Sequence, residues 1–140
     1  MEVSAAIIVN GTKVLCFKKG VSKHDYLSGH YEFPGGKLES GETPSLALVR
    51  ELAEELNYVV DIDSLEHYDD VDFDYEDFTV KLHYFFIRDS SPVYELKEHK
   101  EAIWVSVDDL NKLEWVGADF VIIKQLMNDY GGDVVETACS

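Results

Sequence analysis

The stretch that decides the fold covers residues 36 to 58 and reads GKLESGETPSLALVRELAEELNY. It predicts a helix from Pro44 to Leu56, because Thr43 can cap the first turn and proline has no amide hydrogen to leave unpaired there. Asn57 favours the left-handed conformation that ends many helices. The apolar stripe that would pack this helix on a core consists of Leu48, Leu52 and Leu56.

A second stripe of this helix carries three carboxylates. Glu51, Glu54 and Glu55 stand at positions i, i+3 and i+4, so their side chains project from one face. Like charges at this spacing destabilise a helix unless positive charge lies among them. A hard divalent cation with oxygen ligands accounts for the arrangement.

Length and charge narrow the classes of function. The chain has 140 residues and a formal net charge of −16, with 46% hydrophobic residues. We expect one folded domain over residues 1–132 and a loose tail over 133–140. The acidity argues against binding to nucleic acid polymers or to anionic membranes. A phosphorylated ligand would therefore need a bound metal or local Lys and Arg residues.

The expected compartment is the cytoplasm. Cys16 and Cys139 lack the paired spacing of a disulfide framework or a zinc site, which suggests a reducing environment. The N-terminus MEVSAAIIVNG has no basic region and too short an apolar run for a signal peptide. No segment approaches the ~20 apolar residues that span a bilayer.

The rest of the chain alternates strand patterns with turns, which predicts an α/β or α+β sandwich with a mixed sheet. Asn10-Gly11 is a hairpin signal, since both residues tolerate positive φ. Residues 20–30 form a polar loop that either closes over a ligand or only connects two strands. Strands or extended segments are expected at 3–9, 14–17, 31–33, 58–62, 65–75, 78–88 and 102–107, and helical segments at 108–113 and 119–130.

The opening stretch resembles the Nudix box, a 23-residue pattern with many fixed positions. The matching residues are Gly36, Glu42, Arg50, Glu51, Leu52, Glu54, Glu55 and Tyr58. The pattern has a glycine where this chain has Asn57, a mild departure because Asn is the usual substitute where glycine supplies positive φ. The flanking FPGGK and the W-V-S at Trp104 extend the similarity to MutT-type Nudix hydrolases over nearly the whole chain.

This resemblance implies an α/β/α sandwich, with a mixed sheet between the Nudix helix and a C-terminal helix. It also implies hydrolysis of a nucleoside-linked diphosphate with Mg²⁺ or Mn²⁺. Glu51, Glu54 and Glu55 would ligate the metal beside the Gly35 or Gly36 carbonyl. Catalysis would also depend on Arg50, which would hold a glutamate in its ligating rotamer. Glu42, at the helix entrance, would either ligate a metal or buttress the loop.

The general base is less well defined by the resemblance. In MutT-like enzymes a carboxylate from a loop beyond the central strands joins the metal site, and Glu98 in KEHKE is the best match. Glu101 is the runner-up. The alternative for both is an ordinary solvated glutamate.

Substrate contacts are expected from several scattered side chains. In MutT relatives the base lies between the early strands and the segment before the last helix, where Asp119 could accept from an exocyclic amine or only cap the helix. Lys18 and Lys19 either meet the substrate or lie free on the surface. Trp115 and Ala118 belong to the same segment, and the aromatic candidates for stacking, each also a candidate for the core, are Tyr31, Phe33, Phe78 and Phe85. The five histidines lack metal-ligand spacing and are interpreted as structural or surface residues: His24, His30, His67, His83 and His99.

Three functions are compatible with this pattern. The leading hypothesis is hydrolysis of a nucleoside triphosphate to a monophosphate and pyrophosphate, as in clean-up of the nucleotide pool, by a monomer or homodimer. The second is hydrolysis of ADP-ribose or another nucleoside diphosphate derivative. The third, a catalytically silent binding domain, is disfavoured by the intact carboxylates. A P-loop is excluded because Gly36-Lys37 is followed by leucine, and no G-x-S-x-G elbow occurs.

Overall fold

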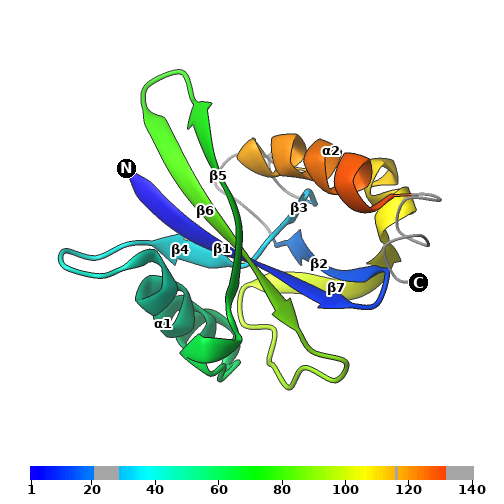
Figure 1. Ribbon diagram of the computed structural model, residues 1–140, viewed down its shortest axis with the longest axis horizontal. Coiled ribbons are helices and arrows are strands. Elements are labelled where there is room, and N and C mark those ends of the chain that lie inside the picture. The colour runs from blue at the N-terminus through cyan, green and yellow to red at the C-terminus, as the bar shows by residue number, and fades with distance from the viewer. Residues whose placement is uncertain (21–28, 116, 132–140) are drawn as a thin grey trace.

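The computed structural model describes residues 1–20, 29–115 and 117–131. A seven-stranded mixed sheet lies between two helices, α1 (Pro44–Leu56) on one face and α2 (Ala118–Tyr130) on the other (Figure 1). Two 3₁₀ turns are η2 (Ile62–Ser64) and η3 (Val107–Lys112). The strands are β1 (Glu2–Asn10), β2 (Lys13–Lys19), β3 (Tyr31–Glu32), β4 (Gly35–Lys37), β5 (Glu66–Asp74), β6 (Thr79–Arg88) and β7 (His99–Ser106). The predicted sandwich with a mixed sheet is confirmed.

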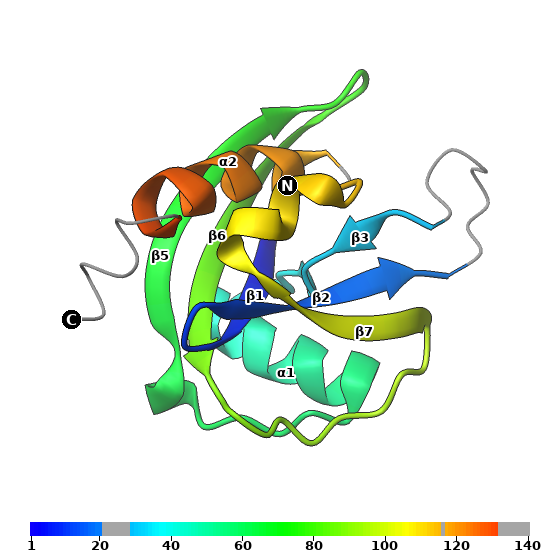
Figure 2. The same cartoon turned by 90° about the vertical axis from the view of Figure 1, so that its right-hand side faces the viewer.

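Strand β1 is the centre of the sheet. It pairs in parallel with β6 and antiparallel with β2 and β4, while β5 pairs with β6, and β3 and β7 pair with β2. Residues 4–9 of β1 are all buried, which is the pattern of a strand covered on both faces. Figure 2 shows β3, β2 and β7 side by side, with α1 beneath β7 in this view.

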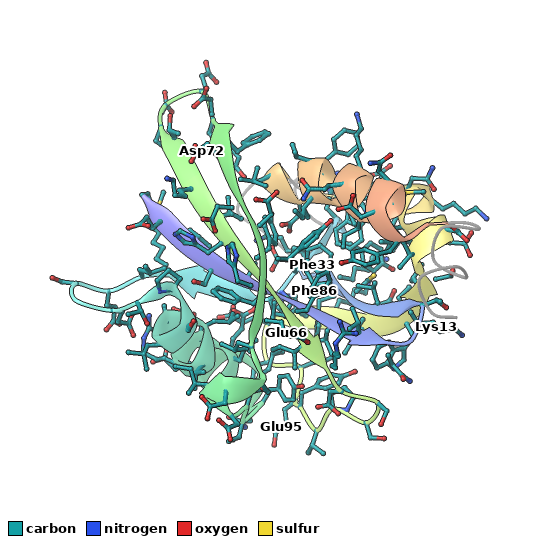
Figure 3. All side chains as sticks on the ribbon, in the orientation of Figure 1. Lys13, Phe33, Glu66, Asp72, Phe86 and Glu95 are labelled. Carbon is teal, nitrogen blue, oxygen red and sulfur yellow. The ribbon has the colours of Figure 1, made fainter. Side chains whose placement is uncertain are left out.

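The alternation of side chains along the central strands divides the core into two layers. On β1, Ala6 and Ile8 face the α1 layer, whereas Ala5 and Ile7 face the α2 layer. Figure 3 shows Phe33 and Phe86 in the interior of the α2 side, whereas Lys13 and Asp72 lie at the periphery. The two layers share the same strands, so each helix is anchored through the sheet to the other.

Helix α1 begins and ends where the sequence predicts. The Thr43 hydroxyl accepts a hydrogen bond of 3.2 Å from the Leu46 N–H, and Pro44 occupies the first turn. Asn57 adopts φ 50° and is the only non-glycine residue with positive φ in the described part of the chain. The helix prediction is confirmed at both ends because capping depends on neighbouring residues alone.

Three local predictions need correction. Val9 pairs with Val14 and Asn10 with Lys13, so the hairpin loop is Gly11-Thr12 rather than Asn10-Gly11. The extended run expected at 58–62 forms no strand, and its last residue begins the 3₁₀ turn η2. Strand β7 begins at His99, earlier than expected, because its first residues pair with the end of β2 across a bulge.

Two expectations fall on undescribed residues. Most of the polar loop at 20–30 and all of the expected tail at 133–140 lie outside the described ranges. Among the described residues, no helix combines the length and the apolar character that a membrane crossing requires.

Candidate active site

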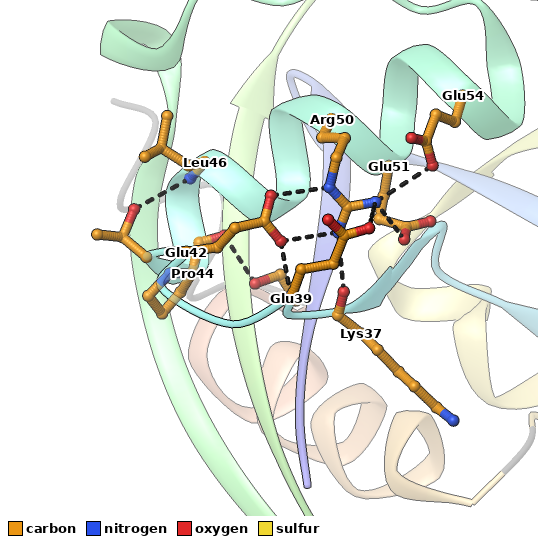
Figure 4. Close-up of polar contacts among 10 residues, drawn as sticks. Lys37, Glu39, Glu42, Pro44, Leu46, Arg50, Glu51 and Glu54 are labelled. Atoms are coloured by element: carbon orange, nitrogen blue, oxygen red, sulfur yellow. Dashed lines mark hydrogen bonds and ion pairs between the residues drawn. The ribbon is translucent and has the colours of Figure 1, made fainter.

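Arg50 organises the acidic face of α1. Its guanidinium donates to both oxygens of Glu42, from Nε and Nη2, at 2.8 Å each. Nη1 donates to Glu51 Oε1 at 2.9 Å and to Glu54 Oε2 at 3.2 Å, as Figure 4 shows. Nη2 also donates to the Lys37 carbonyl at 3.0 Å, which ties the helix to the end of β4.

Glu42 buttresses this arrangement. Besides its two bonds to Arg50, it accepts a hydrogen bond of 2.7 Å from the Glu39 N–H. These hydrogen bonds, with that from Arg50 the largest cause, lower the pKa of Glu42 to about 2. Of the two roles open to Glu42 in the sequence, the structure shows the buttress: both oxygens are occupied by the arginine fork.

Gly36 lies against the carboxylate of Glu51. A Cβ at position 36 would clash with this carboxylate group, so only glycine leaves it in place. Gly35 has φ 157°, and a Cβ there would clash with the Ser4 backbone of β1. The two glycines therefore let β4 pass between β1 and the start of the acidic helix face.

Glu55 is the most buried of the three helix carboxylates. Its side chain is 13% exposed, against 21% for Glu51 and 61% for Glu54. Burial raises the pKa of Glu55 to about 7 although the charge of His99 lowers it, and the charges of Glu32, Glu98 and Glu51 raise it further. A divalent cation would remove this mutual repulsion, so an all-oxygen donor set near Gly36 fits a metal on electrostatic grounds.

The two candidates for the general base have different surroundings. Glu98 is exposed at the start of β7, and its charge acts on Glu55. Glu101 accepts a hydrogen bond of 2.8 Å from the Tyr31 hydroxyl. Because Tyr31 belongs to the core layer of α2, Glu101 is directed away from the helix carboxylates. Its position therefore makes Glu98 a better candidate for the general base than Glu101.

A pocket of about 270 Å³ opens beside these carboxylates. It is bounded by β1, β3, β4, the hairpin between β5 and β6, and the start of α2. Of the predicted substrate contacts, Phe33, Phe78 and Asp119 line it. Glu32 and Gly35 line it too, so the pocket extends to the edge of the acidic site.

Asp119 lines this pocket and is buried. Its Oδ1 accepts a hydrogen bond of 2.6 Å from the Tyr84 hydroxyl, and its Oδ2 accepts one of 3.1 Å from the Phe33 N–H. The N-cap of α2 is Gly117 and Asp119 lies in the first turn, but its two oxygens accept from Tyr84 and Phe33 rather than from an N–H of the helix. Burial raises the pKa of Asp119 to about 7, although both hydrogen bonds lower it.

The aromatic candidates divide between the pocket and the core. Phe78 is 49% exposed and stacks on Tyr75, with ring centroids 5.1 Å apart, at the rim of the pocket. Trp115 is buried behind Phe33, with centroids 4.8 Å apart, and donates its indole N–H to the Leu110 carbonyl. Phe85 packs in the α1 layer. A pocket contact from Trp115 or Phe85 therefore lacks support in this arrangement.

Lys18 and Lys19, at the end of β2, contact residues of the neighbouring strand β3. Lys19 Nζ is 3.4 Å from Glu32 Oε1, and Lys18 Nζ is 6.0 Å from the centroid of the Tyr31 ring. Lys19 therefore neutralises part of the negative charge beside the pocket, while Lys18 covers an aromatic face.

Sequence reasoning missed Glu32 and His99. Their side chains meet Glu55 beside the pocket, which Glu32 lines, although the sequence indicates only a structural or surface role for His99 and none for Glu32. Neither residue has a spacing that relates it to the helix, and only the pairing of β2 with both β3 and β7 brings them together. A glutamate directly before the glycine-rich bend is the one local signal available.

Comparison with known proteins gives a consistent result. The NUDIX domain matches residues 1–126. The chain is 32% identical over 135 residues to the "Putative 8-oxo-dGTP diphosphatase 2" of Mycobacterium tuberculosis, covering 96% of this chain and 93% of that protein. It is 28% identical to the "CTP pyrophosphohydrolase" of Escherichia coli, covering 91% of each. The solution structure of the E. coli ORF135 protein matches with a TM-score of 0.76 and 28% identity, over 91% of this chain and 89% of that one.

Proposed function

This chain belongs to the NUDIX domain family and is a pyrophosphohydrolase, and we propose that it converts a nucleoside triphosphate to a monophosphate and pyrophosphate. The observation that carries the proposal is one continuous site. The pocket that Asp119 lines is also lined by Glu32 and Gly35, and Glu32 lies close to Glu55 of α1. A base held at Asp119 would thus place its phosphates toward the acidic face.

Nudix hydrolases need a divalent metal, and we propose Mg²⁺, with Mn²⁺ as a substitute, held by Glu51, Glu54, Glu55 and Glu98 and by the Gly35 or Gly36 carbonyl. When bound, the metal neutralises phosphate oxygens and lowers the pKa of the attacking water. Arg50 acts through Glu51: its hydrogen bond fixes that carboxylate, while Glu42 fixes the guanidinium. Glu98 is exposed and its charge acts on Glu55, which supports the proposal that it accepts the proton of the water.

Substrate selection is proposed to depend on Asp119 and the pocket rim. Each Asp119 oxygen already accepts one hydrogen bond and keeps a further lone pair, so the carboxylate can accept from the exocyclic amine of a base. Phe78 offers an exposed face for stacking at the rim. Relatives bear the names of an 8-oxo-dGTP diphosphatase and a CTP pyrophosphohydrolase, and both substrates carry such an amine.

The test is product release from a panel of nucleotides with Mg²⁺. The panel contains 8-oxo-dGTP, dGTP, CTP, dCTP and ADP-ribose, and pyrophosphate is distinguished from phosphate by adding inorganic pyrophosphatase. We expect pyrophosphate from at least one triphosphate. Activity confined to ADP-ribose would support the second hypothesis instead.

Glu54→Gln tests the metal assignment. The substitution keeps the size of the side chain and removes its charge, so hydrolysis should fall by about 10²-fold or more because a metal ligand is lost. Glu66→Gln is the matched control, since Glu66 is a half-exposed glutamate of β5 that pairs with Arg88 of β6. Full activity in a pure Glu54→Gln sample would show that the assignment is wrong.

A further inference from the structure

Three side chains from three elements converge beside the pocket, which one of them lines. They are Glu32 of β3, Glu55 of α1 and His99 of β7. His99 Nε2 lies 2.8 Å from Glu32 Oε2 and 3.4 Å from Glu55 Oε1. One donor atom from each residue lies within 4.8 Å of the others, and in residues 1–20, 29–115 and 117–131 no second group of this kind occurs.

This cluster is enclosed rather than solvated. The side chain of His99 is 2% exposed, that of Glu55 13% and that of Glu32 24%. Although burial opposes it, the hydrogen bond from His99 and the charge of Lys19 lower the pKa of Glu32 below its usual value. Two half-buried carboxylates thus face the same ring nitrogen, a costly arrangement without positive charge between them.

A hydrogen-bonded core histidine explains only part of this geometry. The N–H on Nε2 is donated to Glu32 at 2.8 Å, whereas the contact with Glu55 at 3.4 Å is longer than a good N–H···O hydrogen bond. The other ring nitrogen, Nδ1, is buried without a hydrogen-bond partner among the described residues. The ring is therefore held by packing and by its Nε2 side, with that nitrogen directed at both carboxylates.

We propose that Glu32, Glu55 and His99 form a mixed nitrogen–oxygen cation site that binds Mn²⁺, Co²⁺ or Zn²⁺ in preference to Mg²⁺. An imidazole nitrogen suits these borderline ions, whereas Mg²⁺ prefers oxygen ligands and retains its water. In the bound state Nε2 coordinates the ion, the neutral ring carries its one hydrogen on Nδ1, and coordination replaces the hydrogen bond from Nε2 to Glu32. This proposal rests on the proposed function in one respect: Glu55 is also one of the ligands proposed for the catalytic metal.

Sharing Glu55 has a consequence for the reaction. An ion at His99 takes one carboxylate from the metal set of the acidic helix face, and it lies at the edge of the nucleotide pocket, which Glu32 lines. Mn²⁺, Co²⁺ or Zn²⁺ bound at this site would therefore alter the hydrolysis that Mg²⁺ supports. Replacing the His99 imidazole would weaken this effect.

The experiment compares Co²⁺ and Mg²⁺ binding by calorimetry in the full chain and its variants. His99→Gln should weaken Co²⁺ binding by about tenfold or more, because a ligand is lost, while Mg²⁺ affinity changes by less than about threefold. His67→Gln is the control, since exposed His67 also contacts a carboxylate, Asp70, away from the cluster. Equal Co²⁺ affinity in wild type and His99→Gln would overturn the proposal.

Two further measurements keep the test decisive. If His99→Gln fails to fold, as judged by circular dichroism, Glu32→Gln takes its place with the same expected loss of Co²⁺ affinity. In the wild type, Zn²⁺ should shift the imidazole ¹⁵N signals of His99 but not those of His83; the absence of a shift at His99 also overturns the site. Failure of the proposed hydrolysis is separable, because binding and nitrogen shifts are recorded without substrate.

Discussion

At the residue scale, the acidic face of α1 depends on a single cation. Arg50 has four carboxylates within 3.6 Å, of which Glu42 takes both the Nε and Nη2 donors. The spacing in the sequence predicts three aligned glutamates, but it does not show that they differ. In the structure Glu51 is fixed by Arg50 and Glu55 by burial, whereas Glu54 remains mostly exposed. Because the three carboxylates differ in this way, substitutions of Glu51, Glu54 and Glu55 are expected to have different effects.

Gly36→Ala should reduce activity more than stability. The added Cβ meets the flexible end of the Glu51 side chain, which can move aside at small cost, but the carboxylate then leaves its place. We expect a fall in kcat of about 10²-fold, the effect of a misplaced group in a positioned site, measured by pyrophosphate release. Gly11→Ala should show the opposite: positive φ 61° strains alanine in the hairpin, so stability falls and activity stays.

Asp119→Asn should flatten the pH dependence of stability between about pH 4 and pH 7. The folded-state pKa of Asp119 is raised to about 7 by burial, above its usual value of 3.8, so the folded protein holds a proton that the unfolded chain has released. Stability therefore falls as pH rises through this window, by about 1.4 kcal/mol per pH unit for each proton retained, and is level above it.

Urea unfolding at a series of pH values measures this slope. Asparagine cannot ionise, so the variant should lack the contribution of Asp119. It should also be less stable at pH 5, because its amide group faces one of the two donors, Tyr84 or Phe33 N–H. The same slope in wild type and Asp119→Asn would contradict the raised pKa.

At the element scale, α1 is defined by its own ends and by one apolar stripe. Thr43→Ala removes the hydroxyl that accepts from the Leu46 N–H and should cost about 1 kcal/mol in the free energy of unfolding. Urea denaturation followed by circular dichroism measures it. Ser45 lies two residues further into the helix, and Ser45→Ala should change the free energy of unfolding by less than about 0.5 kcal/mol. A loss as large for Ser45→Ala would show that general helix content, and not the cap, is responsible.

The start of strand β7 is set by its pairing with β2 and not by its own sequence. The sequence predicts its centre, but its first residues extend into the charged run KEHKE because β2 offers a partner there. The bulge between Lys18 and Lys19 shifts the pairing so that Lys19 meets His99 while Lys18 meets Glu101. As a result His99 turns toward Glu55, and Glu101 turns to Tyr31 on the other face.

At the scale of the whole molecule, the two core layers are coupled by the strands they share. Leu52 is fully buried in the α1 layer, so Leu52→Ala should lower the free energy of unfolding by about 2–5 kcal/mol. Leu46 lies on the same helix but is 50% exposed, and Leu46→Ala should cost less than about 1 kcal/mol.

The coupling itself is tested by comparing two probes of the Leu52→Ala variant. Helical circular dichroism reports both helices, and tryptophan fluorescence includes Trp115, which is buried in the α2 layer. We expect one transition at a common, lowered urea concentration, because neither layer has a core without β1 and β6. Separate transitions would mean that the layers unfold independently.

By itself, the sequence determined the acidic helix, both of its ends, the mixed-sheet sandwich and the family, because these depend on local hydrogen bonds, on the period of a helix or strand, and on fixed spacing. Only the tertiary structure decided that Asp119 accepts from Tyr84 and Phe33 rather than capping its helix. It also decided that Glu32, Glu55 and His99 meet. Such contacts arise from strand register and from the packing of a helix on a sheet, and no short stretch of sequence specifies either.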